Sequence, residues 1–188
     1  MPNWCNNSVV ITHDFPEMIA RAKTAFEAGR LLDEFIPVPK ALIDTVSGSF
    51  SDDEEQRKLK EQSAANLATY GYANWYDFCV NEWGTKWDIG NDGECQDVEN
   101  GLQLTFDSAW SPPVEAYKRL EEQGFHIEAM YYEPGVAFCG EYTTGLGENT
   151  IDIEGDSTWV EENVPEVLDH AFAISENMAL WEEDSVDD

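Results

Sequence analysis

The sequence predicts an α+β protein: a ferredoxin-like split β-α-β sandwich with a helical insert and an acidic C-terminal helix. Two observations predict this class. Leu102, Leu104 and Phe106 alternate with polar residues, which is typical of a strand with one buried face. Outside an insert at about 40–83, the expected order is strand, helix, strand, strand, helix, strand, strand, which is that of a split β-α-β fold with its helices on one sheet face.

The first half of the chain is expected to contain a strand, a helix and the insert. Residues 8–12 are mostly β-branched and predict the first strand. Pro16 opens an amphipathic helix that Gly29 ends. Within the insert, residues 52–70 predict a solvated helix and residues 74–83 a more aromatic one.

The middle of the chain predicts two strands and a helix. Residues 85–89 and 102–108 are expected to be strands around a polar loop. Ser111, followed by two prolines, is expected to cap the next helix, which Gly124 ends.

The remainder predicts strands and a long helix. Residues 125–133 and 136–142 are expected to be strands joined by the turn at 134–135, with a short strand at 150–153. A helix is expected at about 165–181, and its apolar stripe suits docking on the open sheet face or, alternatively, a homodimer interface. The stripe consists of Val164, Val167, Ala171, Ile174 and Met178.

This organisation predicts a ferredoxin-like domain at 1–145 and an acidic extension at 146–188 packed on or beside it. The N-terminus resembles no signal peptide, and no apolar run reaches the roughly 18 residues of a membrane span. The sequence therefore predicts a cytoplasmic protein whose four cysteines are reduced, mostly buried thiols.

The charge of the chain excludes several kinds of partner. Its 39 Asp and Glu against 10 Lys and Arg give a formal charge of -29. Direct binding of nucleic acid requires cations that neutralise phosphates, and an anionic membrane would repel this chain. The imbalance grows along the sequence, because residues 140–188 contain 15 acids and no base. The second half is therefore expected to present an acidic surface.

Four sequence blocks carry a resemblance to a known family: MPNWCNN at 1–7, WGTKWD at 83–88, FDSAWSPP at 106–113 and YEPGVAFCG at 132–140. They resemble the YubB ferredoxin-like family of plasmid and phage proteins. The resemblance implies a ferredoxin-like fold and a mobile genetic element as source. It implies no catalytic residues, because that family has no established activity to transfer.

Residues 88–99 approach the pattern of an EF-hand calcium loop. Acids stand at positions 1, 5 and 12 and glycine at position 6, but Gly90 replaces the usual ligand at position 3. We therefore favour an acidic hairpin loop and expect no metal or cofactor. The remaining candidates for a divalent cation are Asp88, Asp92, Asp97 and Glu99.

Tryptophans are unusually frequent, and two interpretations remain open. They form the core or, alternatively, a platform on which a ligand stacks, and we favour the core. Lys86 lies between two of them in sequence and is expected to make a cation–π contact. The candidate ligand region consists of Trp83, Lys86, Trp87 and Trp110, within a wider set that adds Trp4 and Trp75.

No Ser-His-Asp context, phosphate-binding loop or dinucleotide fingerprint is present in the sequence. The sequence therefore favours a non-enzymatic protein. Our leading hypothesis is a nucleic-acid mimic that binds and inhibits a basic host protein, for example a defence enzyme. Acidic residues three and four positions apart on a helix have Cβ atoms about 5–6 Å apart, a spacing that resembles an array of phosphates. The expected partner-binding carboxylates are Asp152, Glu154, Asp156, Glu161, Glu162, Glu166, Asp169, Glu176, Glu182, Glu183 and Asp184.

Two alternatives are kept. The acidity could reflect solvation or adaptation to salt, which melting at high and low salt would test. Alternatively, a small-molecule-binding, cation-binding or enzymatic domain uses the Trp-rich region, which thermal shifts with calcium or nucleotides would test.

Overall fold

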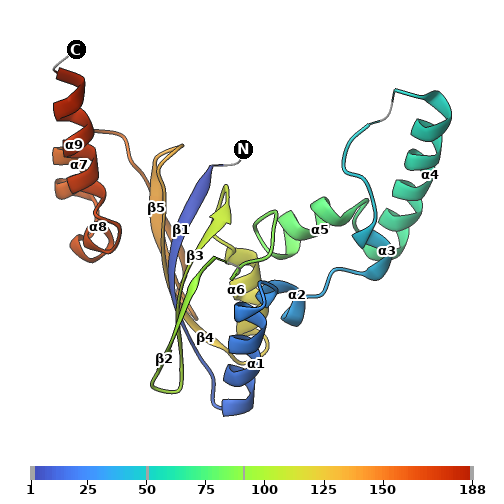
Figure 1. Ribbon diagram of the computed structural model, residues 1–188, viewed down its shortest axis with the longest axis horizontal. Coiled ribbons are helices and arrows are strands. Elements are labelled where there is room, and N and C mark those ends of the chain that lie inside the picture. Colours follow the sequence, from blue (N-terminus) through green and yellow to red (C-terminus); the bar gives the residue numbers. More distant parts are fainter. Residues whose placement is uncertain (1–2, 50, 91, 187–188) are drawn as a thin grey trace.

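The computed structural model describes residues 3–49, 51–90 and 92–186, with side chains as far as Glu183. The described residues form a six-stranded antiparallel sheet with helices on both faces (Figure 1). The strands are β1 (Trp4–Thr12), β2 (Glu94–Val98), β3 (Gly101–Ala109), β4 (His126–Glu133), β5 (Phe138–Thr143) and β6 (Gly147–Asp152). The helices are α1 (Pro16–Glu27), α2 (Leu31–Phe35), α3 (Lys40–Ile43), α4 (Asp53–Tyr70), α5 (Trp75–Glu82), α6 (Val114–Glu121), α7 (Ser157–Asn163), α8 (Glu166–Phe172) and α9 (Ile174–Val186).

The sheet order is β2-β3-β1-β4-β5-β6. The first four of these strands, with α1 after β1 and α6 after β3, have the order and connections of a ferredoxin-like sandwich. The predicted fold class is therefore confirmed. Strands β5 and β6 extend the sheet beyond β4, and β6 pairs along its whole length with β5, so the sheet continues into the sequence after residue 145.

The main core lies between the sheet and helices α1 and α6. Side chains alternate along β1, so Val9 and Ile11 are buried while Ser8 and Val10 are half-exposed. Phe26 of α1 belongs to the same buried cluster. The opposite face of the sheet, called the open face below, carries the alternate residues and is free of α1 and α6.

Residues 85–89 were expected to form a strand, and this prediction is wrong. They form a loop in which the hydroxyl of Thr85 and the carboxylate of Asp88 hydrogen-bond to backbone groups of other segments. Gly90 ends the loop with φ of 116°, and its Cα lies so close to Phe26 that an added Cβ would be 2.1 Å from the Phe26 carbonyl oxygen. The strand beside β3 is instead β2, at 94–98.

Ser111 was expected to cap the helix after β3, but α6 begins at Val114 and Ser111 does not cap it. Its hydroxyl donates to the carbonyl of Gly84 at 2.6 Å and so ties the two segments together.

The insert at about 40–83 contains helices α3, α4 and α5, and α2 lies just before it. The short helices α2 and α3 lie in a stretch for which no helix was predicted. Helix α4 begins where Asp52 accepts the N–H groups of Glu54 and Glu55, and it ends at Gly71, which is left-handed. Within α4 only Leu59 and Asn66 are buried, and Figure 1 shows this helix standing away from the sheet.

The C-terminal region differs from the single helix expected at 165–181. It folds into α7, α8 and α9, with a break between α8 and α9 at Ala173, where φ is 50°. These helices lie on the side of the sheet opposite α1 and α6 (Figure 1), and Val164, Ile174 and Met178 pack there, as expected for docking of the C-terminal apolar stripe on the open sheet face. Val160, Leu168 and Ile174 pack there against Cys139 of β5 in a second buried cluster.

No helix in the described part of the chain combines the length and apolar character that a membrane span requires. All four cysteines are free thiols, and Cys5, Cys79 and Cys139 are buried.

Candidate functional site

The four sequence blocks meet at one end of the sheet. Antiparallel pairing places Trp4 opposite Ala109 and Asn6 opposite Tyr132, so the start of β1 lies beside the ends of β3 and β4. The N–H of Trp110 donates to the carbonyl of Asn3 at 2.9 Å and extends this pairing beyond the strands. Segments up to about 130 residues apart in the sequence therefore form one surface.

Four exposed or half-exposed aromatic side chains gather at this end, and we call them the aromatic cluster: Trp4, Tyr76, Trp87 and Trp110. The indoles of Trp4 and Trp87 lie 5.8 Å apart between ring centroids at 36°, and Tyr76 meets Trp110 edge-on at 6.4 Å. Trp4 is 45% exposed, while Trp87 and Trp110 are each 40% exposed. Such exposure of large rings beside one another is typical of binding surfaces.

Lys86 lies among these rings. Its ammonium nitrogen is 4.6 Å from the centroid of Trp87, 5.3 Å from that of Trp110 and 5.8 Å from that of Tyr76. The expected cation–π contact is therefore present. Among the described residues no carboxylate pairs with Lys86, so aromatic faces take the place of the usual counter-ion.

Trp83 does not join the aromatic cluster, although it belongs to the ligand region expected from sequence. Its side chain is buried beside Phe78, and its indole N–H donates to the carbonyl of Ile36 at 3.0 Å. The core interpretation is therefore correct for Trp83, whereas Trp87 and Trp110 lie at the surface. Trp4, which was named only in the wider set, takes the place of Trp83 in the cluster.

Trp110 has an unusual backbone conformation, with φ of 67°. A left-handed conformation is rare for a bulky residue and costs on the order of 1–3 kcal/mol, so the surrounding structure must impose it. The bond from Trp110 N–H to Asn3 and the two prolines that follow Ser111 fix the chain on either side. With this backbone conformation the indole of Trp110 lies at the surface, beside the ammonium group of Lys86.

A buried polar network supports this end of the sheet. The amide of Asn7 donates to the hydroxyl of Ser108 at 2.9 Å, and Ser108 donates to the carbonyl of Ser111 at 2.7 Å. Ser111 donates in turn to Gly84. The network links β1, β3 and the loop that carries Lys86, so it fixes the position of the aromatic cluster.

One atom of this network lacks a partner. The Asn7 side chain is only 3% exposed, and its amide nitrogen also donates to the carbonyl of Cys5 at 2.8 Å. Because this terminal atom of the Asn7 side chain contacts hydrogen-bond acceptors, it is the amide nitrogen, and the other terminal atom is the oxygen. Among the described residues, that oxygen accepts no hydrogen bond. A buried acceptor without a partner is rare and costs about 1–3 kcal/mol.

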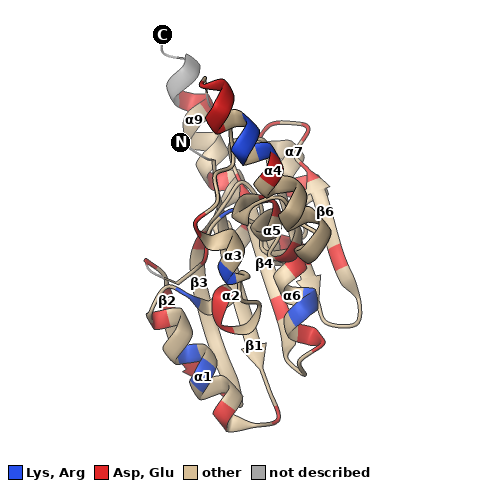
Figure 2. Ribbon diagram, turned by 90° about the vertical axis from the view of Figure 1, so that its right-hand side faces the viewer, with Lys and Arg blue, Asp and Glu red and all other residues tan. Residues whose placement is uncertain are grey.

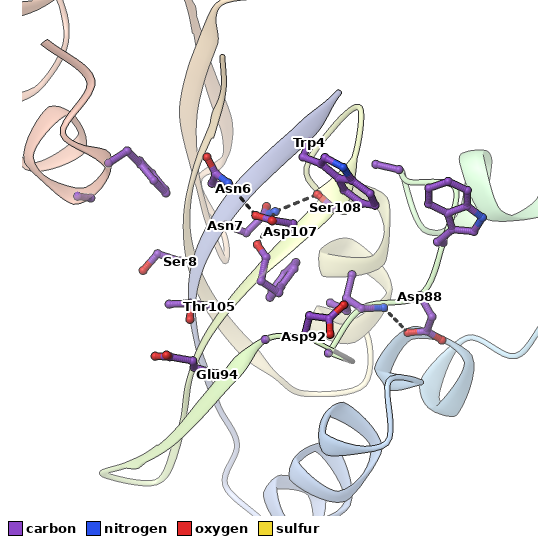
Figure 3. A pocket seen from close by; sticks show the side chains of 18 residues that line it. Trp4, Asn6, Asn7, Ser8, Asp88, Asp92, Glu94, Thr105, Asp107 and Ser108 are labelled. Carbon is purple, nitrogen blue, oxygen red and sulfur yellow. Dashed lines mark hydrogen bonds between the residues drawn. The ribbon is translucent and has the colours of Figure 1, made fainter. Parts of the chain in front are cut away.

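A groove of about 690 Å³ lies beside the aromatic cluster. It follows the edge of β3 near its end, and we call it the β3-edge groove. Figure 3 shows Ser8, Thr105 and Glu94 on one side of the strands and Asp88 and Asp92 on the other. The groove is therefore lined from both faces of the sheet, by Trp4, Asn6, Asn7, Ser8, Trp87, Asp88, Ile89, Gly90, Asp92, Gly93, Glu94, Thr105, Phe106, Asp107, Ser108, Ala109, Ala171 and Phe172.

The β3-edge groove is acidic. Its described lining contains the carboxylates of Asp88, Asp92, Glu94 and Asp107 and no Lys or Arg. Asp107 lies on the open face, where its carboxylate accepts the side-chain amide of Asn6 at 2.7 Å. The groove thus combines negative charge with the flat faces of two indoles.

The four carboxylates proposed from sequence for a divalent cation do not converge. Asp88 accepts the N–H groups of Leu32, Asp33 and Ile89 at 2.7–2.8 Å, and burial raises its pKa. Asp97 pairs with Lys23 at 2.6 Å. No group of three or more potential metal ligands occurs among the described residues.

The carboxylates proposed as a partner-binding surface lie on α7, α8 and α9 and on the segment before them, which starts at the end of β6. Asp156 caps α7 by accepting the N–H of Trp159, and Glu182 accepts both the N–H and the hydroxyl of Ser157. Asp169 is buried and accepts the N–H and hydroxyl of Ser175. The carboxylates of these three residues stabilise the C-terminal helices through hydrogen bonds. The side chain of Asp184 lies outside the described residues.

The remaining members are exposed: Asp152, Glu154, Glu161, Glu162, Glu166, Glu176 and Glu183. Together with Glu182, which is also exposed, we call them the acidic C-terminal surface. Among the described residues none of them forms an ion pair. In Figure 2 the Lys and Arg residues fall on helices such as α1, α4 and α6. Because Ala173 divides the helix expected at 165–181, these carboxylates do not form one array on one helix axis.

A family model of a ferredoxin-like domain matches part of the chain and agrees with the fold. Residues 82–171 match the family model described as "Ferredoxin-like domain in Api92-like protein". The matched segment contains Lys86, Trp87, Trp110 and the whole of β3. Among solved structures, the chain is similar to the crystal structure of protein Api92 from Yersinia pseudotuberculosis, with 14% identity, a TM-score of 0.42, and coverage of 82% of this chain and 99% of that one. A search of curated proteins gave no match.

Proposed function

We propose that the protein is a non-enzymatic binding protein whose acidic C-terminal surface occupies the nucleic-acid-binding surface of a basic partner protein. One observation carries the proposal. From residue 140 onward the chain has no Lys or Arg, and the exposed carboxylates of this surface have no cationic partner within the described protein. An array of unpaired like charges destabilises a folded protein, and a cationic partner would relieve that repulsion.

The support beneath this surface suits recognition of a folded partner. Helices α7, α8 and α9 are held on the sheet by the cluster around Cys139, Val160 and Ile174. Tyr132 and Phe172 add a ring contact at 6.2 Å between the sheet and α8. The carboxylates are therefore presented on an ordered support, which reduces the entropy lost on binding.

The buried thiols Cys79 and Cys139 are poorly suited to nucleophilic catalysis. Burial raises the pKa of Cys79 to about 12 and that of Cys139 to about 11, which is opposite to the shift that activates a thiol nucleophile. The resemblance to plasmid and phage proteins of the YubB family suggests the biological setting: a protein of a mobile element that acts in the host cytoplasm against a basic defence enzyme.

The proposal is tested by affinity capture from a nuclease-treated bacterial lysate at about 0.1 M and 0.5 M salt, where exposed charges are screened to different degrees. We expect a nucleic-acid-binding protein to be captured at low salt and released at high salt. Adding one equivalent of the protein should then abolish nucleic-acid binding by the purified partner.

The matched variants are E161Q/E162Q/E166Q/E176Q on the acidic C-terminal surface and D53N/E54Q/E55Q/E61Q on α4. Each removes four negative charges, so general charge attraction would respond equally to both. Capture and inhibition should be lost only in the first. Equal capture by both variants, or a captured partner that still binds nucleic acid, would overturn the proposal.

A second candidate function rests on the aromatic cluster, because three rings surround the ammonium of Lys86. In this alternative the rings bind a small planar or cationic molecule. Thermal shifts with nucleotides, calcium and quaternary ammonium compounds test it, and a ligand-dependent rise in the melting temperature that W87L removes would favour it.

A further inference from the structure

Strand β3 extends beyond its neighbour on the outer side. Strand β2 pairs with residues 101–105 of β3, and its last partner at this end is Thr105, opposite Glu94. Residues 106–109 of β3 pair with β1 on the other side only. This part of β3 is therefore an edge strand within an otherwise continuous sheet, and an edge strand can accept an added strand.

The direction of the backbone groups along this edge follows from two contacts. The N–H of Trp110 bonds toward the β1 side, at Asn3, whereas both backbone groups of Ala109 bond away from β1, to Thr85. Because direction alternates along an antiparallel strand, the N–H and carbonyl of Asp107 also face away from β1. No described residue hydrogen-bonds to these two groups of Asp107.

The β3-edge groove surrounds this edge. Asn6 and Asp107 line it from the open face, and Asn7 and Ser108 line it from the face covered by helices. An added strand beside β3 would direct its alternate side chains to these two faces. Phe172 of α8 also lines the groove, on the open face of the sheet.

The charge of the groove selects the kind of segment. Asp92, Glu94 and Asp107 line it, and its described lining has no Lys or Arg. The indoles of Trp4 and Trp87 offer flat faces at one end of it. A guanidinium group pairs with carboxylates through planar hydrogen bonds and stacks on aromatic rings, so arginine fits this combination better than lysine.

The backbone of Asp107 supplies support that does not depend on charge. Its N–H and carbonyl face the groove side of β3 and have no partner among the described residues. An extended segment could satisfy both groups. The carboxylates alone would not indicate a ligand, but two unpaired backbone groups beside the same groove do.

We infer that the β3-edge groove binds an extended, arginine-bearing segment of a partner protein, which adds to the sheet as a strand beside residues 106–108 of β3. This inference rests on the proposed function and deepens it. The acidic C-terminal surface attracts the basic partner, and the groove takes up one of its extended segments through the backbone of Asp107.

The probe is a blocked heptapeptide of alternating arginine and valine, titrated by calorimetry into the full chain. The control peptide has the same sequence and charge but is N-methylated at every internal amide, so it has no N–H groups to donate to β3. We expect the control peptide to bind at least about tenfold more weakly. In ¹⁵N spectra the amide of Asp107 should shift with the first peptide and not with the control.

Two protein variants of equal charge locate the site. D107N/E94Q removes two carboxylates from the groove while an oxygen remains at residue 107 to accept Asn6, and E161Q/E166Q removes two from the acidic C-terminal surface. We expect the groove variant to weaken binding about tenfold and the other variant less than about twofold.

Three results would overturn the inference: no binding of the first peptide, equal binding of both peptides, or equal loss in both variants. The proposed function would survive each of them, because its own test depends on capture and on E161Q/E162Q/E166Q/E176Q. Conversely, failure of capture with intact peptide binding would overturn the proposed function and leave the groove as a peptide site.

Discussion

The hydroxyl of Thr85 donates to the carbonyl of Ala109 at 3.0 Å and accepts the N–H of the same residue at 3.1 Å. A single side chain thus satisfies both outward backbone groups of Ala109, as a neighbouring strand would. Thr85 is itself buried, so water does not replace these bonds.

Replacing this hydroxyl should destabilise the end of the sheet. T85V keeps the size of the side chain but leaves both groups of Ala109 unpaired, so we expect a loss of about 1–3 kcal/mol in the free energy of unfolding, measured in urea. T85S keeps the hydroxyl and should lose much less. Equal stability of T85V and the wild type would show that the two bonds contribute nothing.

Lys86 should stabilise the aromatic cluster through its charge. K86M keeps the length of the side chain and removes the ammonium, and we expect a loss of about 0.5–1 kcal/mol in urea unfolding, with a change in tryptophan emission. The control is K40M on α3, which also removes one positive charge but contacts no aromatic ring in the described part of the chain. If both variants lose the same stability, the effect is one of net charge.

The break between α8 and α9 should depend on Asp169. Its carboxylate accepts the N–H of Ser175 at 2.7 Å and the hydroxyl at 2.6 Å, across the left-handed Ala173. D169A should cost about 1–3 kcal/mol and accelerate hydrogen exchange in α9, because a backbone N–H loses its acceptor. S175A removes only the hydroxyl bond and should have a smaller effect. Unchanged exchange in D169A would contradict this role.

Only one of the four thiols should react readily in the folded protein. Burial, reinforced by Asp88, raises the pKa of Cys79 to about 12, and burial raises that of Cys5 further still. A raised pKa lowers the thiolate fraction at every pH below it, so at about pH 8 these thiols are almost fully protonated. Cys95 is half-buried, and its pKa is also raised by burial.

Alkylation with iodoacetamide followed by mass spectrometry measures this order. Cys95 should be modified first in the native protein, and all four cysteines should be modified in urea. Modification of native Cys79 as fast as Cys95 would show that the core around α5 opens readily.

The sequence predicts the central strands well because their side chains alternate between a buried and an exposed face. β3 is predicted within one residue, since Leu102, Leu104 and Phe106 all face α1 and α6. β2 is missed because Glu94–Val98 is a polar edge strand without such a pattern. The C-terminal break is missed because an alanine such as Ala173 gives no local signal for a left-handed conformation; tertiary contacts impose it.

The candidate site is only partly predictable for a related reason. Lys86 and Trp87 are recognisable from their spacing, but register alone places Trp4 beside them. Trp83 and Trp87 are both tryptophans in one short segment, yet one is buried and the other exposed because the loop turns at Gly84, where φ is 81°. The open edge of β3 depends on where β2 begins, which the sequence does not show.

The negative charge of the molecule is unevenly distributed between its two sides. Its cations lie in the residues before 120, while the acidic C-terminal surface lies on the opposite side of the sheet from α1 and α6. An approaching positive body therefore exerts a torque as well as an attraction, and it turns the acidic side toward itself before the two surfaces meet. The distribution of charge along the chain thus determines which side of the protein first meets a positively charged partner.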